Sequence, residues 1–121
     1  MKGAVFPRSV ATLACLLGAA HLALTPLAYR GWEVDSLWFV GAGLAICFAA
    51  VANLVMAGRH ERKARAALFL INLSMTSYFA AAYLILPEPQ VIAGAAIFAA
   101  LTLNCLVARG DATKTITDRS A

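Results

Sequence analysis

The chain has 121 residues, of which 62% are hydrophobic and 13% are charged, and its formal net charge at pH 7 is +4. A water-soluble domain is closer to about 45–50% apolar and about 25% charged, and a small fold has too little interior to bury so much apolar surface. The composition therefore excludes an ordinary soluble domain. The basic residues avoid the long apolar runs, so their excess indicates membrane topology and not nucleic-acid binding.

Four apolar segments are long enough to cross a bilayer, which needs about 20 residues of helix. All four lack Asp, Glu, Lys and Arg. Backbone polar groups in lipid must satisfy one another, so we expect every segment to be a helix and the chain to be an all-α integral membrane protein. In chain order, the segments cover residues 9–29, 36–57, 66–86 and 90–108.

The first segment also has features of a secretory signal peptide, because Lys2 and Arg8 precede its apolar run. However, it is long for the apolar region of such a signal. Cleavage after Ala28 would also place Pro26 at the −3 position, where a small residue is favoured. We therefore expect residues 9–29 to be retained as the first membrane helix.

Short connections join the segments, and the last of them is the Pro87-Glu88-Pro89 turn. Proline ends one helix there and permits the next helix to start. Helices joined by short links lie side by side and antiparallel. We therefore predict an antiparallel four-helix bundle over residues 1–110, followed by a polar tail at 111–121 that we expect to be disordered.

The distribution of Lys and Arg predicts the orientation of the bundle. All but Arg30 fall before the first segment, between the second and third segments, or after the fourth. Positive charge favours the cytoplasmic side, so we expect both termini to be cytoplasmic and Glu33, Asp35 and Glu88 to face outward. The high alanine content and the excess of arginine over lysine are typical of GC-rich bacteria, so we expect a multi-pass protein of the bacterial inner membrane.

The two halves of the chain resemble each other at an offset of 51 residues, which places residues 21–57 over residues 72–108. Identical pairs include Gly43 with Gly94 and Asn53 with Asn104. Alanine-rich helices also match by chance, so duplication and chance similarity both stay open. A true duplication predicts two parallel-repeat helical hairpins that pack as a pseudo-symmetric pair.

A few polar residues interrupt the apolar segments, and these predict where a ligand binds. The candidate ligand-binding residues are His21, Asn53, Asn72, Tyr78 and Asn104. His21 is the one histidine or charged residue within the four segments, and such groups are costly to bury and often functional. Two alternatives stay open: a neutral His21 hydrogen-bonded to Ser77 or Tyr78, and asparagines in interhelical hydrogen bonds of about 0.6–2 kcal/mol.

The sequence does not indicate a catalytic or metal centre. Cys15, Cys47 and Cys105 lie in apolar segments without a C-x-x-C pair, so we expect no disulfide framework. We also find no paired carboxylates, no nucleophile beside a base and no metal-ligand spacing. We therefore expect no catalytic residues, no bound metal and no cofactor.

Residues 37–45, together with Asn53 and with His21 and Pro26 upstream, resemble a small group of uncharacterised bacterial four-helix inner-membrane proteins. The resemblance covers nearly the whole chain and implies the four-helix fold and the inner membrane, but no known chemistry. Size and helix number are also similar to those of small multidrug-resistance transporters. Those transporters need a glutamate in the first helix, and the segment at 9–29 has no carboxylate, which argues against that assignment.

We expect the protein to bind or transport a small hydrophobic or lipid-like molecule in an intramembrane cavity. The first alternative is an accessory or scaffolding subunit of a larger membrane complex, and a membrane enzyme ranks third. Membrane lipids are the expected partners, with assembly into a homodimer or a larger complex, and no nucleic acid is expected to bind.

Overall fold

The computed structural model describes residues 5–59 and 61–119, and it describes side chains as far as residue 107. This part of the chain is all-helical, with α1 (Val5–Ala28), α2 (Val34–Met56), α3 (Arg62–Ile85) and α4 (Pro89–Arg119). All four helices are long and apolar enough to cross a membrane. The predicted antiparallel four-helix membrane bundle is therefore confirmed, and the chain is a multi-pass membrane protein.

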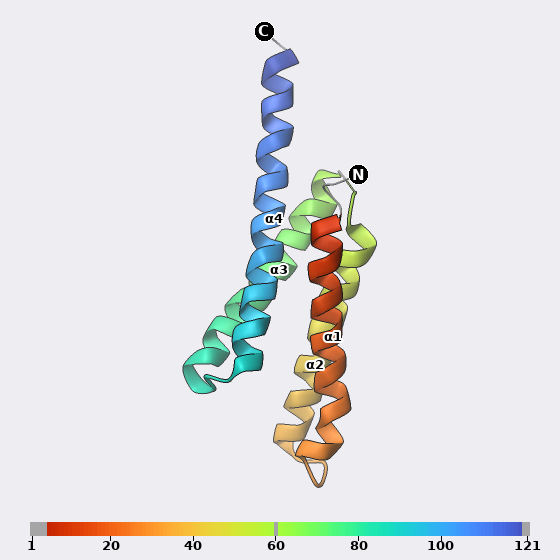
Figure 1. Ribbon diagram of the computed structural model, residues 1–121, viewed down its shortest axis with the longest axis vertical. Coiled ribbons are helices and arrows are strands. Elements are labelled where there is room, and N and C mark those ends of the chain that lie inside the picture. The colour runs from red at the N-terminus through yellow and green to blue at the C-terminus, as the bar shows by residue number, and fades with distance from the viewer. Residues whose placement is uncertain (1–4, 60, 120–121) are drawn as a thin grey trace.

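The bundle consists of two helical hairpins, α1–α2 and α3–α4 (Figure 1). The most extensive contacts lie within each hairpin, and the hairpins meet where α1 contacts α4 and α2 contacts α3. The start of α1 and the α2–α3 connection lie at the same end of the molecule, and the tips of the two hairpins point the other way, apart from each other (Figure 1). The two hairpins therefore run in the same direction.

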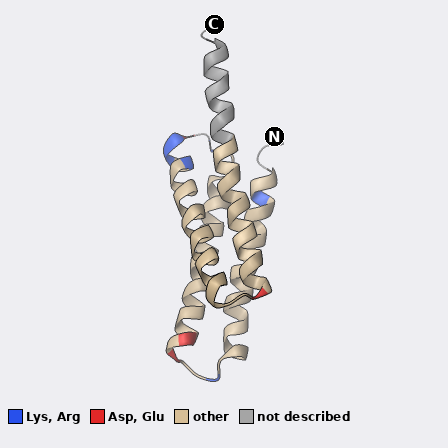
Figure 2. Ribbon diagram, turned by 90° about the vertical axis from the view of Figure 1, so that its left-hand side faces the viewer, with Lys and Arg blue, Asp and Glu red and all other residues tan. Residues whose placement is uncertain are grey.

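Charge is distributed unevenly along the bundle (Figure 2). Basic residues gather at the end that carries the start of α1 and the α2–α3 connection, which we call the basic end. The acidic residues Glu33, Asp35 and Glu88 lie at the opposite end, at the hairpin tips, where Arg30 is also found. A band of helix without any charged residue separates the two groups, as expected for helices that cross hydrocarbon.

The helices begin earlier than the apolar pattern predicts. α1 begins at Val5 and not at residue 9, and α3 begins at Arg62 and not at residue 66, so both helices include basic residues before the predicted apolar segment. Long basic side chains reach the headgroup region from a helix that starts above the hydrocarbon, so a charged first turn is compatible with a membrane helix. The apolar span of α4 ends at Val107, and its backbone continues as a helix to Arg119. The predicted disorder of residues 111–121 stays a prediction.

Small residues allow close approach of α1 and α2. A Cβ atom added at Gly18 would lie 2.6 Å from the Cys47 Sγ atom and 3.0 Å from both the Cys47 backbone nitrogen and the Gly43 carbonyl oxygen. Such contacts are typical of helix association in lipid, where van der Waals packing replaces the hydrophobic effect. In the second hairpin, the stacked rings of Phe79 and Phe98 have centroids 5.9 Å apart and fill the space between α3 and α4.

The structure does not repeat at the 51-residue offset of the sequence. α3 begins and ends 57 residues after the corresponding bounds of α1, and α4 begins 55 residues after α2. Gly43 faces Leu22 of α1, whereas Gly94 faces Phe79 of α3 and not Leu73, the residue aligned with Leu22. The hairpins are parallel, as a duplication would require, but their internal contacts are not equivalent.

Candidate functional site

Asn53 and Asn72 form a reciprocal amide pair between α2 and α3. The Asn53 Nδ2 atom donates to the Asn72 Oδ1 atom at 2.7 Å, and the Asn72 Nδ2 atom donates to the Asn53 Oδ1 atom at 2.9 Å. Asn53 also donates to the Ala49 carbonyl at 2.8 Å, and Asn72 makes a long contact of 3.9 Å to the Cys105 Sγ atom. Both side chains are buried, so a ligand would reach these amides only by separating the two hairpins.

A second polar contact lies one helical turn further along α3. The hydroxyl oxygens of Thr76 and Thr102 lie 3.3 Å apart, and each hydroxyl is also within hydrogen-bond distance of a carbonyl of its own helix. Thr76 follows Asn72 by four residues on α3, so the threonine contact lies next to the asparagine pair along the same face of this helix. The polar side chains in the middle of the bundle therefore satisfy one another, which is the interhelical alternative recognised in the sequence.

His21 lies within the first hairpin and not between the hairpins. Its ring stacks on Phe39 of α2 with centroids 4.6 Å apart and an interplanar angle of 20°. The Nδ1 atom lies 3.2 Å from the Leu17 carbonyl oxygen of the same helix. The structure describes no hydrogen bond from His21 to Ser77 or Tyr78, and it gives the imidazole an aromatic neighbour instead.

The two other candidate residues occupy separate places. Tyr78 is 50% exposed on the outer face of α3, where its ring makes an edge contact with Phe79. Asn104 is half-buried on α4, and its amide does not belong to the Asn53–Asn72 pair. The five residues predicted from the sequence therefore do not converge on one cavity in the part of the chain that the structure describes.

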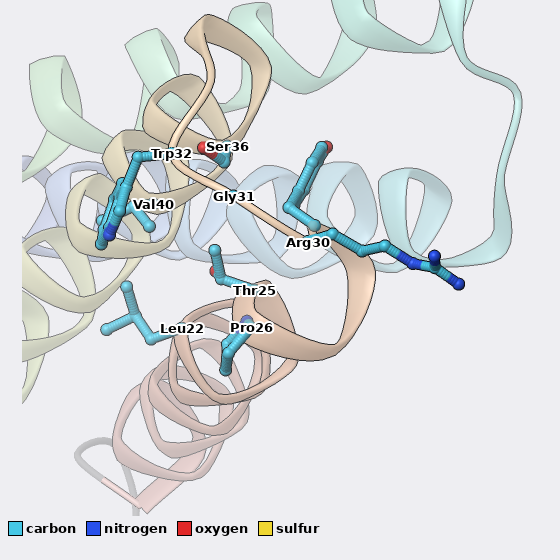
Figure 3. A pocket seen from close by; sticks show the side chains of 9 residues that line it. Leu22, Thr25, Pro26, Arg30, Gly31, Trp32, Ser36 and Val40 are labelled. Atoms are coloured by element: carbon cyan, nitrogen blue, oxygen red, sulfur yellow. The ribbon is translucent and has the colours of Figure 1, made fainter.

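A cavity of about 530 Å³ lies at the tip of the first hairpin, and we call it the tip pocket (Figure 3). α1 contributes Leu22, Thr25 and Pro26, the connection contributes residues 29–32, and α2 contributes Ser36 and Val40. Leu22 and Pro26 face the side chains of Trp32 and Val40, while Arg30 extends away from them (Figure 3). The walls of the pocket are therefore mainly apolar, and its charged group lies at the rim.

Most polar groups around the tip pocket already have partners. The Thr25 hydroxyl donates to the His21 carbonyl at 2.9 Å, and the Ser36 hydroxyl donates to the Glu33 carbonyl and accepts from its backbone N–H, both at 2.8 Å. The Leu22 carbonyl is an exception. It lacks the usual helical hydrogen bond, because Pro26, four residues later, has no N–H to donate. An apolar molecule with a single hydrogen-bond donor suits such a lining.

A second cavity of about 280 Å³ lies at the basic end, between α3 and α4, and we call it the basic pocket. It is lined by Arg62, Arg65, Ala66, Phe69, Leu70, Cys105 and Leu106. The pocket therefore combines two arginine side chains with an apolar floor that includes Phe69, Leu70 and Leu106. The two pockets share no residue and lie at opposite ends of the bundle.

None of the five candidate residues lines either pocket. Sequence reasoning gave weight to polar residues within apolar segments, and these proved to be largely engaged with one another or with their own helix. A usable signal for the tip pocket was present in Pro26, which removes a helical hydrogen bond, and in the aromatic residues Tyr29 and Trp32 of the nearby connection. Tyr and Trp favour the membrane–water interface, so two such residues in a connection between membrane helices were a signal for this end of the hairpin.

The described residues contain no group of three His, Cys, Asp or Glu side chains placed to hold a metal ion. Cys15, Cys47 and Cys105 are free thiols. Comparison with protein families, curated proteins and solved structures gives no match for this chain.

Proposed function

We propose that the protein binds a small hydrophobic or lipid-like molecule in the tip pocket. The observation that supports this function is the 530 Å³ cavity with apolar walls between α1, α2 and their connection. Pockets for small molecules commonly have about 300–1,000 Å³ and mostly apolar linings with few polar groups. The proposed site replaces the set predicted from the sequence, of which Asn53 and Asn72 are already paired with each other.

Binding fits the structure better than passage across the membrane. The tip pocket and the basic pocket lie at opposite ends, and the buried core separates them. A transporter of the alternating-access type has its substrate site near the middle of the bilayer, between two repeats. Here the stacked Phe79 and Phe98 rings fill the middle of the second hairpin, and the Asn53–Asn72 pair joins α2 to α3 closer to the basic end.

The distribution of charge supports a location in the bacterial inner membrane with both termini in the cytoplasm. The basic end carries Arg8, Arg59, Arg62, Lys63 and Arg65, and positively charged connections are retained on the cytoplasmic side. In this orientation the tip pocket opens at the outer surface of the membrane. A ligand would then enter from the outer leaflet or from the periplasm.

Native mass spectrometry of the protein, extracted with its own lipids in a mild detergent, tests the proposal. We expect a discrete bound mass on the wild-type protein. The variant Val40→Trp, which fills the tip pocket, should lose this mass. The matched control Leu37→Trp places the same side chain on an exposed position of α2 that does not line the pocket, and it should retain the mass.

The variant His21→Ala distinguishes the two candidate sites, since His21 does not line the tip pocket. Loss of the bound mass in His21→Ala but not in Val40→Trp would reject the tip pocket and favour the site predicted from the sequence. A wild-type protein that carries only phospholipid, unchanged in Val40→Trp, would count against a ligand in the tip pocket.

The accessory-subunit alternative has its own structural support on α3. Ser74, Ser77 and Tyr78 lie on one exposed face at mid-span, and no hydrogen bond is described for their hydroxyls within the described residues. Hydroxyl groups that face hydrocarbon are satisfied by a neighbouring helix or by their own backbone. Crosslinking from a photoreactive residue at position 77 in intact membranes should capture one partner protein under this alternative, and only lipid if the face meets the bilayer.

A further inference from the structure

The basic pocket lies where the headgroups of a bilayer would surround the protein. α3 begins at Arg62, and the arginine-bearing first turns of α3 form one side of the pocket, with Cys105 and Leu106 of α4 on the other side. The apolar span of α4 ends at Val107, next to the pocket. The pocket is therefore open at the level where hydrocarbon gives way to the polar headgroups.

The spacing of the lining residues arranges charge above apolar surface along one face of α3. Arg62, Ala66 and Leu70 follow each other at four-residue intervals, and so do Arg65 and Phe69. Residues four apart lie on the same face of a helix. At 1.5 Å per residue, Leu70 lies about 12 Å deeper than Arg62, so the pocket continues from two guanidinium groups into the hydrocarbon.

The charge at this place favours an anion. Guanidinium groups bind phosphate in a planar, bidentate geometry, and the positive end of the α3 helix dipole adds to the attraction. Leu70 and Leu106 are 62% and 44% exposed, so the apolar floor is accessible to a chain that approaches from the bilayer. A free anion would leave this floor uncovered, whereas a phospholipid covers it.

We propose that the basic pocket binds one anionic phospholipid. Its phosphate is held by Arg62 and Arg65, and one acyl chain lies along Phe69, Leu70 and Leu106. Clusters of basic residues next to membrane helices attract anionic lipids of the adjacent leaflet, and here a cavity would fix one such lipid. The site is separate from the tip pocket, so it does not depend on the proposed function.

The test measures binding of phosphatidylglycerol to the full chain in detergent by native mass spectrometry, with phosphatidylcholine of the same acyl chains for comparison. We expect saturable binding of one phosphatidylglycerol and weaker binding of phosphatidylcholine. The double variant Arg62→Gln/Arg65→Gln should bind phosphatidylglycerol about tenfold or more weakly, because charge-assisted hydrogen bonds to the phosphate are lost.

The matched control is Arg59→Gln/Lys63→Gln, which removes the same charge from the same end at exposed positions outside the pocket. Its affinity for phosphatidylglycerol should stay within about threefold of wild type, since only distant and screened charge is removed. Equal losses in the two double variants would show a diffuse electrostatic effect and reject the pocket. Displacement of the lipid by glycerol phosphate at equal concentration would assign the site to a free anion instead.

A measurement on the wild-type protein avoids any effect of the substitutions on folding. Phosphatidylglycerol with a photoreactive group in the upper part of its acyl chain should crosslink to the peptide that contains Phe69 and Leu70, or to the one that contains Leu106. Labelling spread over the exposed faces of all four helices would overturn the proposal.

Discussion

Asn53 and Asn72 join the two hairpins through a pair of amide hydrogen bonds of 2.7 and 2.9 Å. The residues are 19 positions apart in the sequence and lie on α2 and α3, on either side of the α2–α3 connection. Each amide uses both its oxygen and its N–H groups, with Ala49 and Cys105 as the additional acceptors. The pair therefore fixes the register of α2 against α3, in a bundle whose hairpins otherwise meet over apolar surface.

We expect Asn53→Ala and Asn72→Ala each to destabilise the protein by about 1–3 kcal/mol, because each leaves a buried amide without its partner. The double variant should lose less than the sum of the two, with a coupling energy of about 0.6–2 kcal/mol. Unfolding in a series of mild detergent and SDS mixtures measures these free energies. Substitution of the half-buried Asn104, which lies outside the pair, provides the control. Additive losses in the double variant would contradict a direct interaction between Asn53 and Asn72.

Gly18 and Gly41 should respond in opposite ways to substitution by alanine. At Gly18 the new methyl group would meet the backbone of Cys47 and Gly43 at 3.0 Å, so α1 and α2 must move apart, at about 1–3 kcal/mol. At Gly41 nothing lies within 4 Å of an added Cβ atom, so Gly41→Ala should be neutral or should stabilise the helix by up to about 1 kcal/mol. The same unfolding assay compares the two variants, and equal effects would argue against close α1–α2 packing.

The variants His21→Phe and His21→Ala separate packing from proton chemistry at His21. His21→Phe preserves a ring over Phe39 and should keep the free energy of unfolding near that of wild type, while His21→Ala should lose at least about 0.5–1.5 kcal/mol of aromatic contact. Thermal melting in detergent at pH 7 provides the measurement. A large loss in His21→Phe as well would show that the imidazole nitrogens contribute more than the stacked ring does.

Labelling of single cysteines tests the orientation of the bundle. In a variant without the three native cysteines, Gly31→Cys lies at the tip of the first hairpin, and Glu61→Cys lies in the connection at the basic end. With the basic end in the cytoplasm, a membrane-impermeant maleimide should label position 31 in intact cells and position 61 only after permeabilisation. The reverse pattern would place both termini outside.

Hydrophobic patterning was sufficient to predict the four helices, since each apolar run is bounded by charge, glycine or proline. The helix ends were less predictable, because basic side chains such as Arg62 can occupy a first turn above the hydrocarbon. The surroundings of the candidate binding residues were less predictable than the helix ends. A sequence shows that His21 and Asn72 are polar and lie within apolar runs, but not that one stacks on Phe39 and the other pairs with Asn53. Pairing across the bundle depends on helix rotation, which composition does not determine.

The division into two hairpins has a consequence for biosynthesis. Because α1 and α2 contact each other more extensively than either contacts the second hairpin, residues 5–56 can enter the bilayer as a unit while α3 is still being translated. During that interval Asn53 has the Ala49 carbonyl as its acceptor, but not yet the side chain of Asn72. Arrival of the second hairpin supplies that partner, so a chain arrested after α2 would leave the Asn53 side-chain oxygen in the membrane without the hydrogen bond that Asn72 donates.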